Sequence, residues 1–187
     1  HMKAKHLARL ALVFDDVKAP AGRFAICVSM RQRAGVDRLV RGWQDYVVVA
    51  PGAADERKRW GEQGFLQVVR HLRSKGKKVV LAGDKNDKVV SARIAASFPD
   101  GVLDLCGQTT LVELADVLAR SAWALTNDSG IMHLASYFDR PVIALFGRTD
   151  PFFYGPWSSR CVAVRKGAVI DAITPEDVIT EVDKFLC

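Results

Sequence analysis

Short apolar runs alternate with longer amphipathic segments along most of this sequence, and no other feature constrains the fold as strongly. The runs are rich in Val, Ile and Ala, show no regular apolar and polar alternation, and cover residues 24–28, 46–50, 78–82, 123–126 and 142–146. Such runs are typical of strands buried on both faces of a parallel sheet. The segments between them place apolar residues three and four positions apart, which predicts helices over residues 32–43, 61–74, 89–97, 110–120 and 131–138. Strands and helices in alternation predict βαβ units, and so a Rossmann-like, doubly wound parallel sheet of the α/β class.

The two ends of the chain follow different patterns. We expect residues 1–22 to hold a cloning remnant, His1-Met2, then an amphipathic interdomain helix and a connector, and residues 23–187 to form the domain itself. Near the other end, Thr174 precedes Pro175 and two acids, the pattern of an N-cap followed by a first helical turn. This pattern predicts a C-terminal helix that ends near residue 185.

Composition narrows the possible classes of protein. No apolar run approaches the roughly 18 residues that cross a bilayer, and no signal peptide is visible, so we expect a soluble, cytoplasmic domain. The four cysteines form no C-x-x-C pair, which indicates reduced thiols rather than a zinc or redox site. The formal net charge of +6 favours an anionic partner, either nucleotide phosphates or a membrane surface. Nucleic acid is disfavoured because no motif of a nucleic-acid-binding module is present.

Three of the predicted strands end in loops of unusual composition, at residues 50–54, at residues 82–87 and after residue 126. In open α/β sheets the carboxyl ends of the strands share one edge, and ligands bind outside that edge. We therefore expect the three loops to form one site.

The loop after residue 126 suggests a phosphate site. A helix that begins near Gly130 would offer free backbone N–H groups and a partial positive charge to an anion. Ser129 can add a hydroxyl donor, and His133, one turn further on, can add a ring N–H. Asp128 would repel phosphate, so we expect it to accept hydrogen bonds from sugar hydroxyls. The plainer interpretation is that Asp128 or Ser129 caps the helix and His133 is structural.

The other loops add cations and acids. Of the cations at residues 57–59, we choose Lys58 as the partner of a diphosphate, although such a triplet is also typical of a solvated surface. The acids at residues 84–87 can bind ribose hydroxyls or simply cap a helix. After residue 146, Arg148 or Thr149 can reach the phosphates, or the loop is an ordered surface segment. No acid cluster has the spacing of a metal site.

A series of short motifs runs in order through residues 46–185: Pro51-Gly52-Ala53, Lys58-Arg59-Trp60, Gly83, Leu111-x-Glu113-Leu114-Ala115, Asn127-Asp128-Ser129-Gly130-x-x-His133-x-Ala135, Pro141, Leu145-Phe146-Gly147-x-Thr149-x-Pro151, Gly155-Pro156 and Ile173-Thr174-Pro175-Glu176-x-Val178. This series resembles the C-terminal half of the ADP-heptose:lipopolysaccharide heptosyltransferases, glycosyltransferase family nine. The resemblance implies the donor-binding, C-terminal half of a GT-B glycosyltransferase.

The resemblance also implies roles for individual residues. Lys58, Ser129, Gly130 and His133 would hold the donor diphosphate, Asp128 would bind heptose hydroxyls, and Asp87 and Thr109 would lie near the ribose and the adenine. The family inverts the anomeric centre without a metal or other cofactor, with ADP-heptose as donor substrate. Ala53 and Ala54 depart from the family pattern, because some members carry hydroxyl residues there.

The resemblance places the general base, an acid, in an N-terminal half. We therefore expect no catalytic residue in this chain and no transfer by it alone. The acceptor would be an anionic lipid-linked saccharide of the lipopolysaccharide inner core, bound through the missing half, with peripheral association at the inner membrane.

Two other functions remain open at this stage, a UDP-sugar 2-epimerase-like domain and a non-catalytic module that binds a nucleotide sugar. His133 and the residues 146–151 argue against the epimerase. A dinucleotide oxidoreductase is disfavoured because no G-x-G-x-x-G follows the first strand.

Overall fold

The computed structural model describes residues 26–156, 158 and 160–186. The expected cloning remnant, interdomain helix and connector therefore lie outside the described residues, as does Cys187. No helix among the described residues is long and apolar enough to cross a membrane.

The described residues form a six-stranded parallel sheet in the order β3-β2-β1-β4-β5-β6. Its strands are β1 Val47–Ala50, β2 Val79–Leu81, β3 Val102–Asp104, β4 Trp123–Asn127, β5 Val142–Phe146 and β6 Cys161–Arg165. The predictions for β1, β2, β4 and β5 are confirmed. The strand prediction over residues 24–28 is wrong for the residues that the structure describes, because residues 26–28 have no regular secondary structure. Strands β3 and β6 were not predicted.

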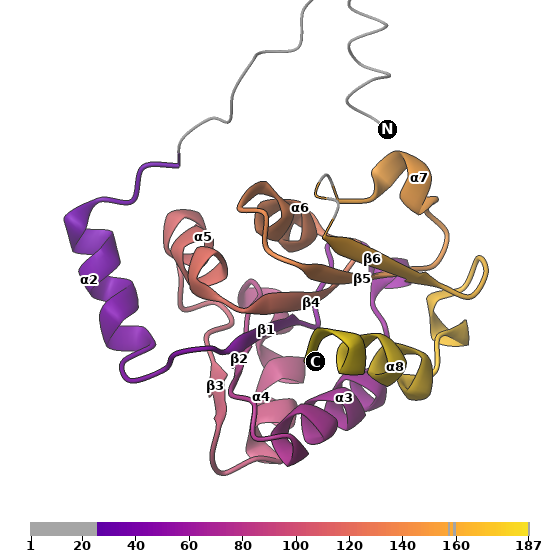
Figure 1. Ribbon diagram of the computed structural model, residues 1–187, viewed down its shortest axis with the longest axis horizontal. Helices are drawn as coiled ribbons and strands as arrows, with labels where there is room; N and C mark the ends of the chain where they lie inside the picture. The colour runs from indigo at the N-terminus through magenta and orange to yellow at the C-terminus, as the bar shows by residue number, and fades with distance from the viewer. Residues whose placement is uncertain (1–25, 157, 159, 187) are drawn as a thin grey trace, which may run out of the picture.

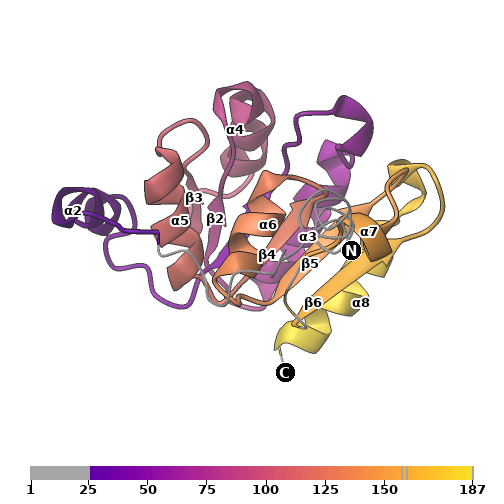
Figure 2. The ribbon, with the colours of Figure 1, turned by 90° about the horizontal axis from the view of Figure 1, so that it is seen from above.

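Helices cover both faces of the sheet, as the doubly wound fold requires (Figures 1 and 2). One face carries α2 Met30–Leu39, α5 Leu111–Arg120 and α6 Gly130–Tyr137, and the other carries α3 Glu62–Ser74, α4 Lys88–Ala96 and α8 Pro175–Leu186. Short elements lie in the loops: α7 Pro151–Tyr154, η1 Glu56–Lys58, η2 Lys85–Asp87 and η3 Ile170–Ala172. The helices predicted from the apolar spacing all appear, with ends shifted by a few residues.

Burial of the central strands on both faces explains their lack of polar alternation. In β1, Val47 and Val49 pack into the hydrophobic cluster under α3 and α8, whereas Val48 packs into the cluster under α5 and α6. All three side chains are fully buried. A strand that is buried on both faces has no solvent-facing positions, so it lacks the regular polar alternation of a half-exposed strand.

Local sequence signals set the helix ends. Thr110 and Glu113 form a reciprocal capping box at the start of α5. Thr174 and Asp177 bond in the same way at the start of α8, which confirms the predicted N-cap. These caps fix the residue at which each helix begins, and so fix where the preceding loops meet.

Candidate functional site

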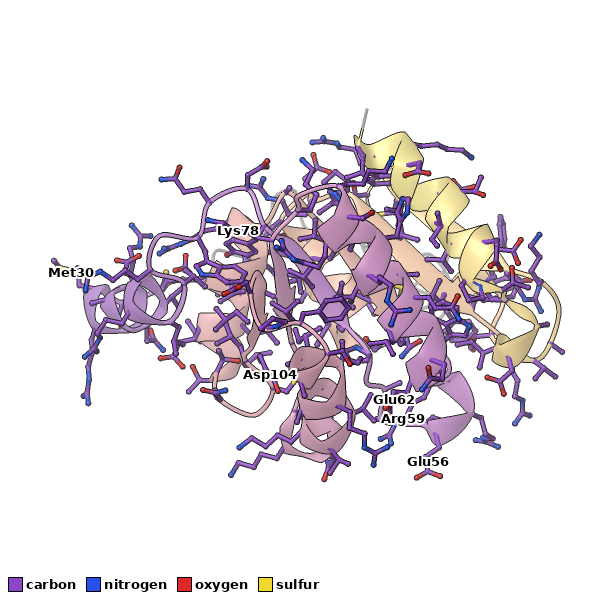
Figure 3. All side chains as sticks on the ribbon, turned by 90° about the horizontal axis from the view of Figure 1, so that it is seen from below. Met30, Glu56, Arg59, Glu62, Lys78 and Asp104 are labelled. Atoms are coloured by element: carbon purple, nitrogen blue, oxygen red, sulfur yellow. The ribbon has the colours of Figure 1, made fainter. Side chains whose placement is uncertain are left out.

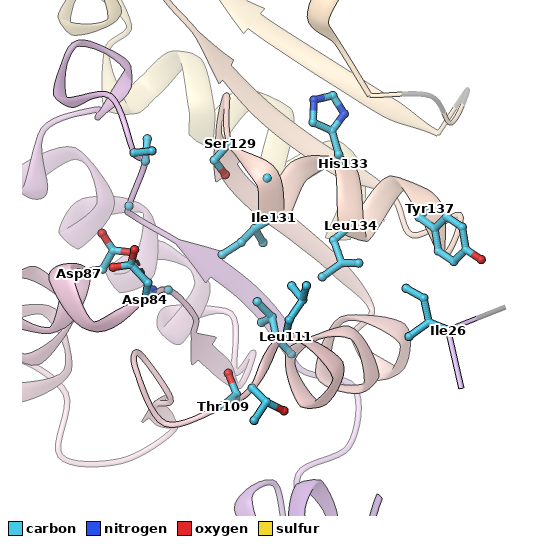
Figure 4. Close-up of a pocket in the computed structure, with 17 residues that line it drawn as sticks. Ile26, Asp84, Asp87, Thr109, Leu111, Ser129, Ile131, His133, Leu134 and Tyr137 are labelled. Carbon is cyan, nitrogen blue, oxygen red and sulfur yellow. Dashed lines mark hydrogen bonds between the residues drawn. The ribbon is translucent and has the colours of Figure 1, made fainter. Parts of the chain in front are cut away.

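A cavity of about 700 Å³ opens at the carboxyl edge of the sheet, a volume within the usual range of ligand sites (Figure 4). It lies where the strand order reverses, because β1 has β2 on one side and β4 on the other. Its walls come from the loops after β1 and β2, from α5, from α6 and from one residue ahead of α2. The described lining residues are Ile26, Gly52, Ala53, Ala54, Gly83, Asp84, Asp87, Thr109, Thr110, Leu111, Leu114, Ser129, Gly130, Ile131, His133, Leu134 and Tyr137. The three loops after β1, β2 and β4 thus meet, as predicted.

The N-terminal end of α6 is open to this cavity. Gly130, its first residue, is exposed, and a side-chain carbon placed there would meet no heavy atom within 4 Å. Ser129 occupies the N-cap position in extended backbone, yet its side chain makes no capping hydrogen bond. Its Oγ is buried and has no hydrogen-bond partner among the described residues. The first backbone N–H groups of a helix lack intrahelical partners, so this end can receive an anion.

Asp128 is buried and paired rather than pointing freely at a ligand. Its side chain is 6% exposed, and its Oδ2 lies 2.7 Å from the Nζ of Lys58, whose side chain is 29% exposed. The Oγ1 of Thr149, in the loop after β5, donates a hydrogen bond to the same carboxylate oxygen. Neither Lys58 nor Asp128 is among the described residues that line the cavity. Loops that follow three strands therefore converge on one carboxylate next to Ser129.

The cations beside Lys58 have structural partners. Arg57 forms an ion pair with Asp55 at 2.8 Å. The Nε of Arg59 donates to the carbonyl oxygen of Ala53 at 2.6 Å. Figure 3 shows Glu56, Arg59 and Glu62 at the start of α3, outside the sheet. Lys58 is thus the cation of the triplet that reaches the loop after β4.

Asp87 fits closely between two glycines in the cavity wall. Its Oδ2 accepts a hydrogen bond from the backbone N of Asp84 at 2.9 Å. A side-chain carbon on Gly52 would lie 2.1 Å from the Asp87 carboxyl group, and one on Gly83 would lie 2.6 Å from it. Burial raises the pKa of Asp87, and the negative Asp84 adds to this, whereas the backbone hydrogen bond and Arg59 lower it. The acid therefore completes the cap of η2 and also faces the cavity.

The other end of the cavity is apolar. Leu111 is 72% exposed at the first position of α5, beside Thr109. Ile131 and Leu134 point from α6 toward α5, whereas His133 points the other way (Figure 4). Exposed apolar side chains in a cavity wall are typical of ligand sites.

His133 lies at the exposed mouth of the cavity. The protein atoms around its imidazole still exclude enough water to lower the pKa, which is the largest influence on it. The carboxylate of Asp128 raises that pKa, and the ammonium of Lys58 lowers it. The ring is therefore mostly neutral at pH 7 and can donate one N–H.

Sequence reasoning gave no role to Asn127, although it named the residue. The side chain is fully buried at the end of β4 and bonds the loop after β1 at three points. A signal was present, because an amide that closes a buried apolar strand must find partners there.

Metal-ligating and thiol chemistry have little support among the described residues. These residues contain no group of three or more His, Cys, Asp or Glu side chains that could hold a metal ion. Cys27, Cys106 and Cys161 are free thiols, and burial raises the pKa of Cys106 to about 12. A thiol in that state is a poor nucleophile.

Comparison with known sequences identifies a family. The family model for glycosyltransferase family 9 (heptosyltransferase) matches residues 4–174, a match that begins well before residue 46. The lipooligosaccharide heptosyltransferase 2 of Haemophilus influenzae is 31% identical over 168 residues, which cover 78% of this chain and 48% of that protein. The chain therefore spans about half the length of the curated relatives that it matches.

Solved structures agree with this result. The E. coli ADP-heptose lipopolysaccharide heptosyltransferase II is 26% identical, with a TM-score of 0.77 over 91% of this chain and 54% of that one. The family 9 glycosyltransferase of Veillonella parvula has a TM-score of 0.85 over 100% of this chain and 60% of that one, at 23% identity. At that identity the second match shows the shared fold alone.

Proposed function

Because the chain belongs to glycosyltransferase family 9, the heptosyltransferases, we propose that its cavity binds the nucleotide-sugar donor ADP-heptose. The chain is then the donor half of an inverting GT-B enzyme that transfers heptose to the inner core of lipopolysaccharide. One observation carries the proposal: the open end of α6, where the buried hydroxyl of Ser129 has no partner among the described residues, faces a cavity of nucleotide size.

The diphosphate would lie at the start of α6. Ser129 and the backbone N–H groups from Gly130 onward would donate to it, with His133 at its outer side. The ammonium of Lys58 has three N–H donors, and Asp128 occupies one side of it, so the others remain for phosphate oxygens. These positive groups would stabilise the negative charge that develops on the departing ADP.

The nucleoside and the heptose would lie on either side of the diphosphate. The ribose hydroxyls would bond Asp87, whose carboxyl group lies against Gly52 and Gly83 in the wall. The adenine would lie against Thr109 and Leu111 at the apolar end. Asp128, next to the diphosphate, would accept hydrogen bonds from the heptose hydroxyls. No cofactor or metal is part of this proposal.

We also propose that this chain transfers no sugar by itself, since a general base must lie on the acceptor hydroxyl and we assign none to it. The acceptor, an anionic lipid-linked saccharide, would be held mainly by an N-terminal half at the cytoplasmic face of the inner membrane. The formal net charge of +6 would attract this chain to a negatively charged membrane surface.

Calorimetric titration with ADP, UDP and GDP, with and without EDTA, tests the donor proposal. We expect selective binding of ADP that EDTA does not weaken. Ser129→Ala should lower the affinity for ADP about tenfold to a hundredfold, the worth of one hydrogen bond to a charged group. Ser97 is an exposed serine at the end of α4, and Ser97→Ala is the matched control, which should leave the affinity for ADP unchanged.

Other outcomes would redirect the assignment. Preference for UDP would favour the epimerase-like alternative, and a requirement for a divalent ion would overturn the metal-free part of the proposal. Absence of binding to all three nucleotides would overturn the donor site in this chain.

A further inference from the structure

The side-chain amide of Asn127 holds both ends of one loop. Asn127 is the last residue of β4 and is fully buried. Its Nδ2 donates to the carbonyl oxygen of Pro51 at 2.7 Å and to that of Gly52 at 3.2 Å. Its Oδ1 accepts from the backbone N of Trp60 at 3.1 Å. These partners are the two ends of the segment 51–60, which leads from β1 toward α3, so one side chain closes the segment on itself.

This segment carries Lys58. The residue ends η1, a single turn held by hydrogen bonds from the backbone N of Lys58 to the Asp55 oxygen and of Arg59 to the Glu56 oxygen. The anchored N–H of Trp60 lies only two residues further along. The ammonium of Lys58 lies 2.7 Å from the carboxylate of Asp128, the residue next to Asn127. Two consecutive residues of the β4–α6 junction therefore hold this segment, one through its backbone and the other through its cation.

The chemistry of the amide suits this double attachment. An Asn side chain offers donors and an acceptor in one rigid plane, whereas a carboxylate offers only acceptors and a hydroxyl is shorter and offers one donor. The bonds are buried, where each is stronger than in water. Without the amide, the two ends of the segment lose their shared anchor on β4, and the bonds from Arg59 to Ala53 and from the Trp60 ring to Ile173 remain.

We propose that Asn127 is a positioning residue for diphosphate binding: its amide fixes the segment 51–60 so that Lys58 stands beside the open end of α6. The inference rests on the proposed donor site. It adds a residue that acts through Lys58 and touches no ligand itself.

A double-mutant cycle tests it. The affinities of ADP and of adenosine are measured for the wild-type chain, for Lys58→Ala, for Asn127→Ser and Asn127→Ala, and for each Asn127 variant combined with Lys58→Ala. Both Asn127 changes are neutral, so the charge near the ligand stays the same. Asn127→Ser keeps a hydroxyl and is the milder change if Asn127→Ala does not fold. Circular dichroism and the binding stoichiometry report the folded fraction.

We expect each Asn127 variant to lower ADP affinity about tenfold or more, close to the effect of Lys58→Ala, with adenosine affinity unchanged. In the Lys58→Ala chain, the same Asn127 change should lower ADP affinity by less than about twofold, because contacting residues of one network are not additive. Thr126→Val is the matched control. It removes a buried hydroxyl that has no hydrogen-bond partner among the described residues, one position away, and should leave both affinities unchanged.

Three results would overturn the inference: full ADP affinity in the Asn127 variants, equal losses for ADP and adenosine, or a loss that persists undiminished in the Lys58→Ala chain. In each case wild-type binding of ADP would leave the donor site standing. If the wild-type chain binds no ADP, the donor site fails and this inference fails with it.

Discussion

At the scale of single residues, the pairing of Asp128 with Lys58 sets what a diphosphate would meet in the proposed donor site. The carboxylate holds the ammonium at 2.7 Å and also accepts a hydrogen bond from Thr149. A diphosphate would therefore compete with Asp128 for part of the charge on Lys58. The competition for Lys58 would weaken the binding of ADP and of ADP-heptose alike, whereas the proposed sugar contact would strengthen the binding of ADP-heptose alone.

Replacing Asp128 by Asn separates those roles. ADP should bind at least as tightly as to the wild type, because Lys58 loses its anionic partner. ADP-heptose should bind about tenfold less tightly relative to ADP, since charged acceptors of sugar hydroxyls are lost. Calorimetry with both ligands gives the ratio, and Asp100→Asn, an exposed acid after α4, controls for net charge. Equal changes in affinity for both ligands would show that Asp128 does not contact the sugar.

His133 makes ADP binding depend on pH if it donates to the diphosphate. In the free chain its pKa lies below the usual value, because protein atoms exclude water from the ring. A bound diphosphate would raise that pKa, so binding takes up a proton. Affinity should then rise as the pH falls through the pKa of the complex, and level off below the pKa of the free chain. Titrations from about pH 8 to about pH 5.5 cover this window.

The profile of His133→Asn isolates the histidine from the titration of ADP itself. We expect a flatter curve for this variant, and an unchanged curve for His71→Asn, whose imidazole bonds Asp183 between α3 and α8. Superimposable curves for the wild type and His133→Asn would show that the ring does not meet the phosphates.

The contacts between side chains were the part of the site that the sequence predicted least well. Ser129 and Gly130 follow directly from a strand that ends and a helix that begins, so their place at the helix terminus was predictable. The bond from Thr149 to Asp128 was not, because it depends on β5 lying beside β4 in the sheet. Sequence spacing gives the elements, whereas their order in the sheet decides which loops touch.

At the scale of elements, the loops after β1 and β2 are fitted to one another. Gly52→Ala would put a carbon 2.1 Å from the carboxyl group of Asp87, so one loop must shift. We expect a loss of about 1–3 kcal/mol in the free energy of unfolding, the usual range for overpacking, measured by urea denaturation. In a chain that carries Asp87→Ala the clashing atoms are absent, and Gly52→Ala should cost less than half as much. The same cost in both chains would show that some other contact is responsible.

The strands that sequence reasoning missed lie at the two edges of the sheet. β3 is three residues long and only partly buried, and β6 mixes buried Val164 with exposed Ala163 and Arg165. Neither resembles the mainly apolar central strands, in which every residue is buried. The false strand at residues 24–28 has the opposite cause, since Ile26 is apolar and lines the cavity instead of joining the sheet.

At the scale of the whole molecule, the chain covers about half the length of its curated relatives. We predict that it binds ADP but gives no sustained transfer when supplied with ADP-heptose and a lipid-linked saccharide acceptor. Product formation over many turnovers is the measurement, with a longer gene product that contains an N-terminal half as positive control. Transfer by the isolated chain would contradict the prediction, and binding without transfer by the longer product would favour a non-catalytic module.

The Asn127 anchor also bears on the order in which the chain folds. It joins residues 76 positions apart, whereas the pairing of β1 with β2 closes a much shorter stretch. Long-range contacts form late because their loop-closure entropy must be met first. At about 5–20 residues per second, synthesis leaves the segment 51–60 without its anchor for roughly 4–15 s. A nascent chain can thus complete β1, α3 and β2 before Asn127 can hold the segment that carries Lys58, so the proposed donor site must wait for β4.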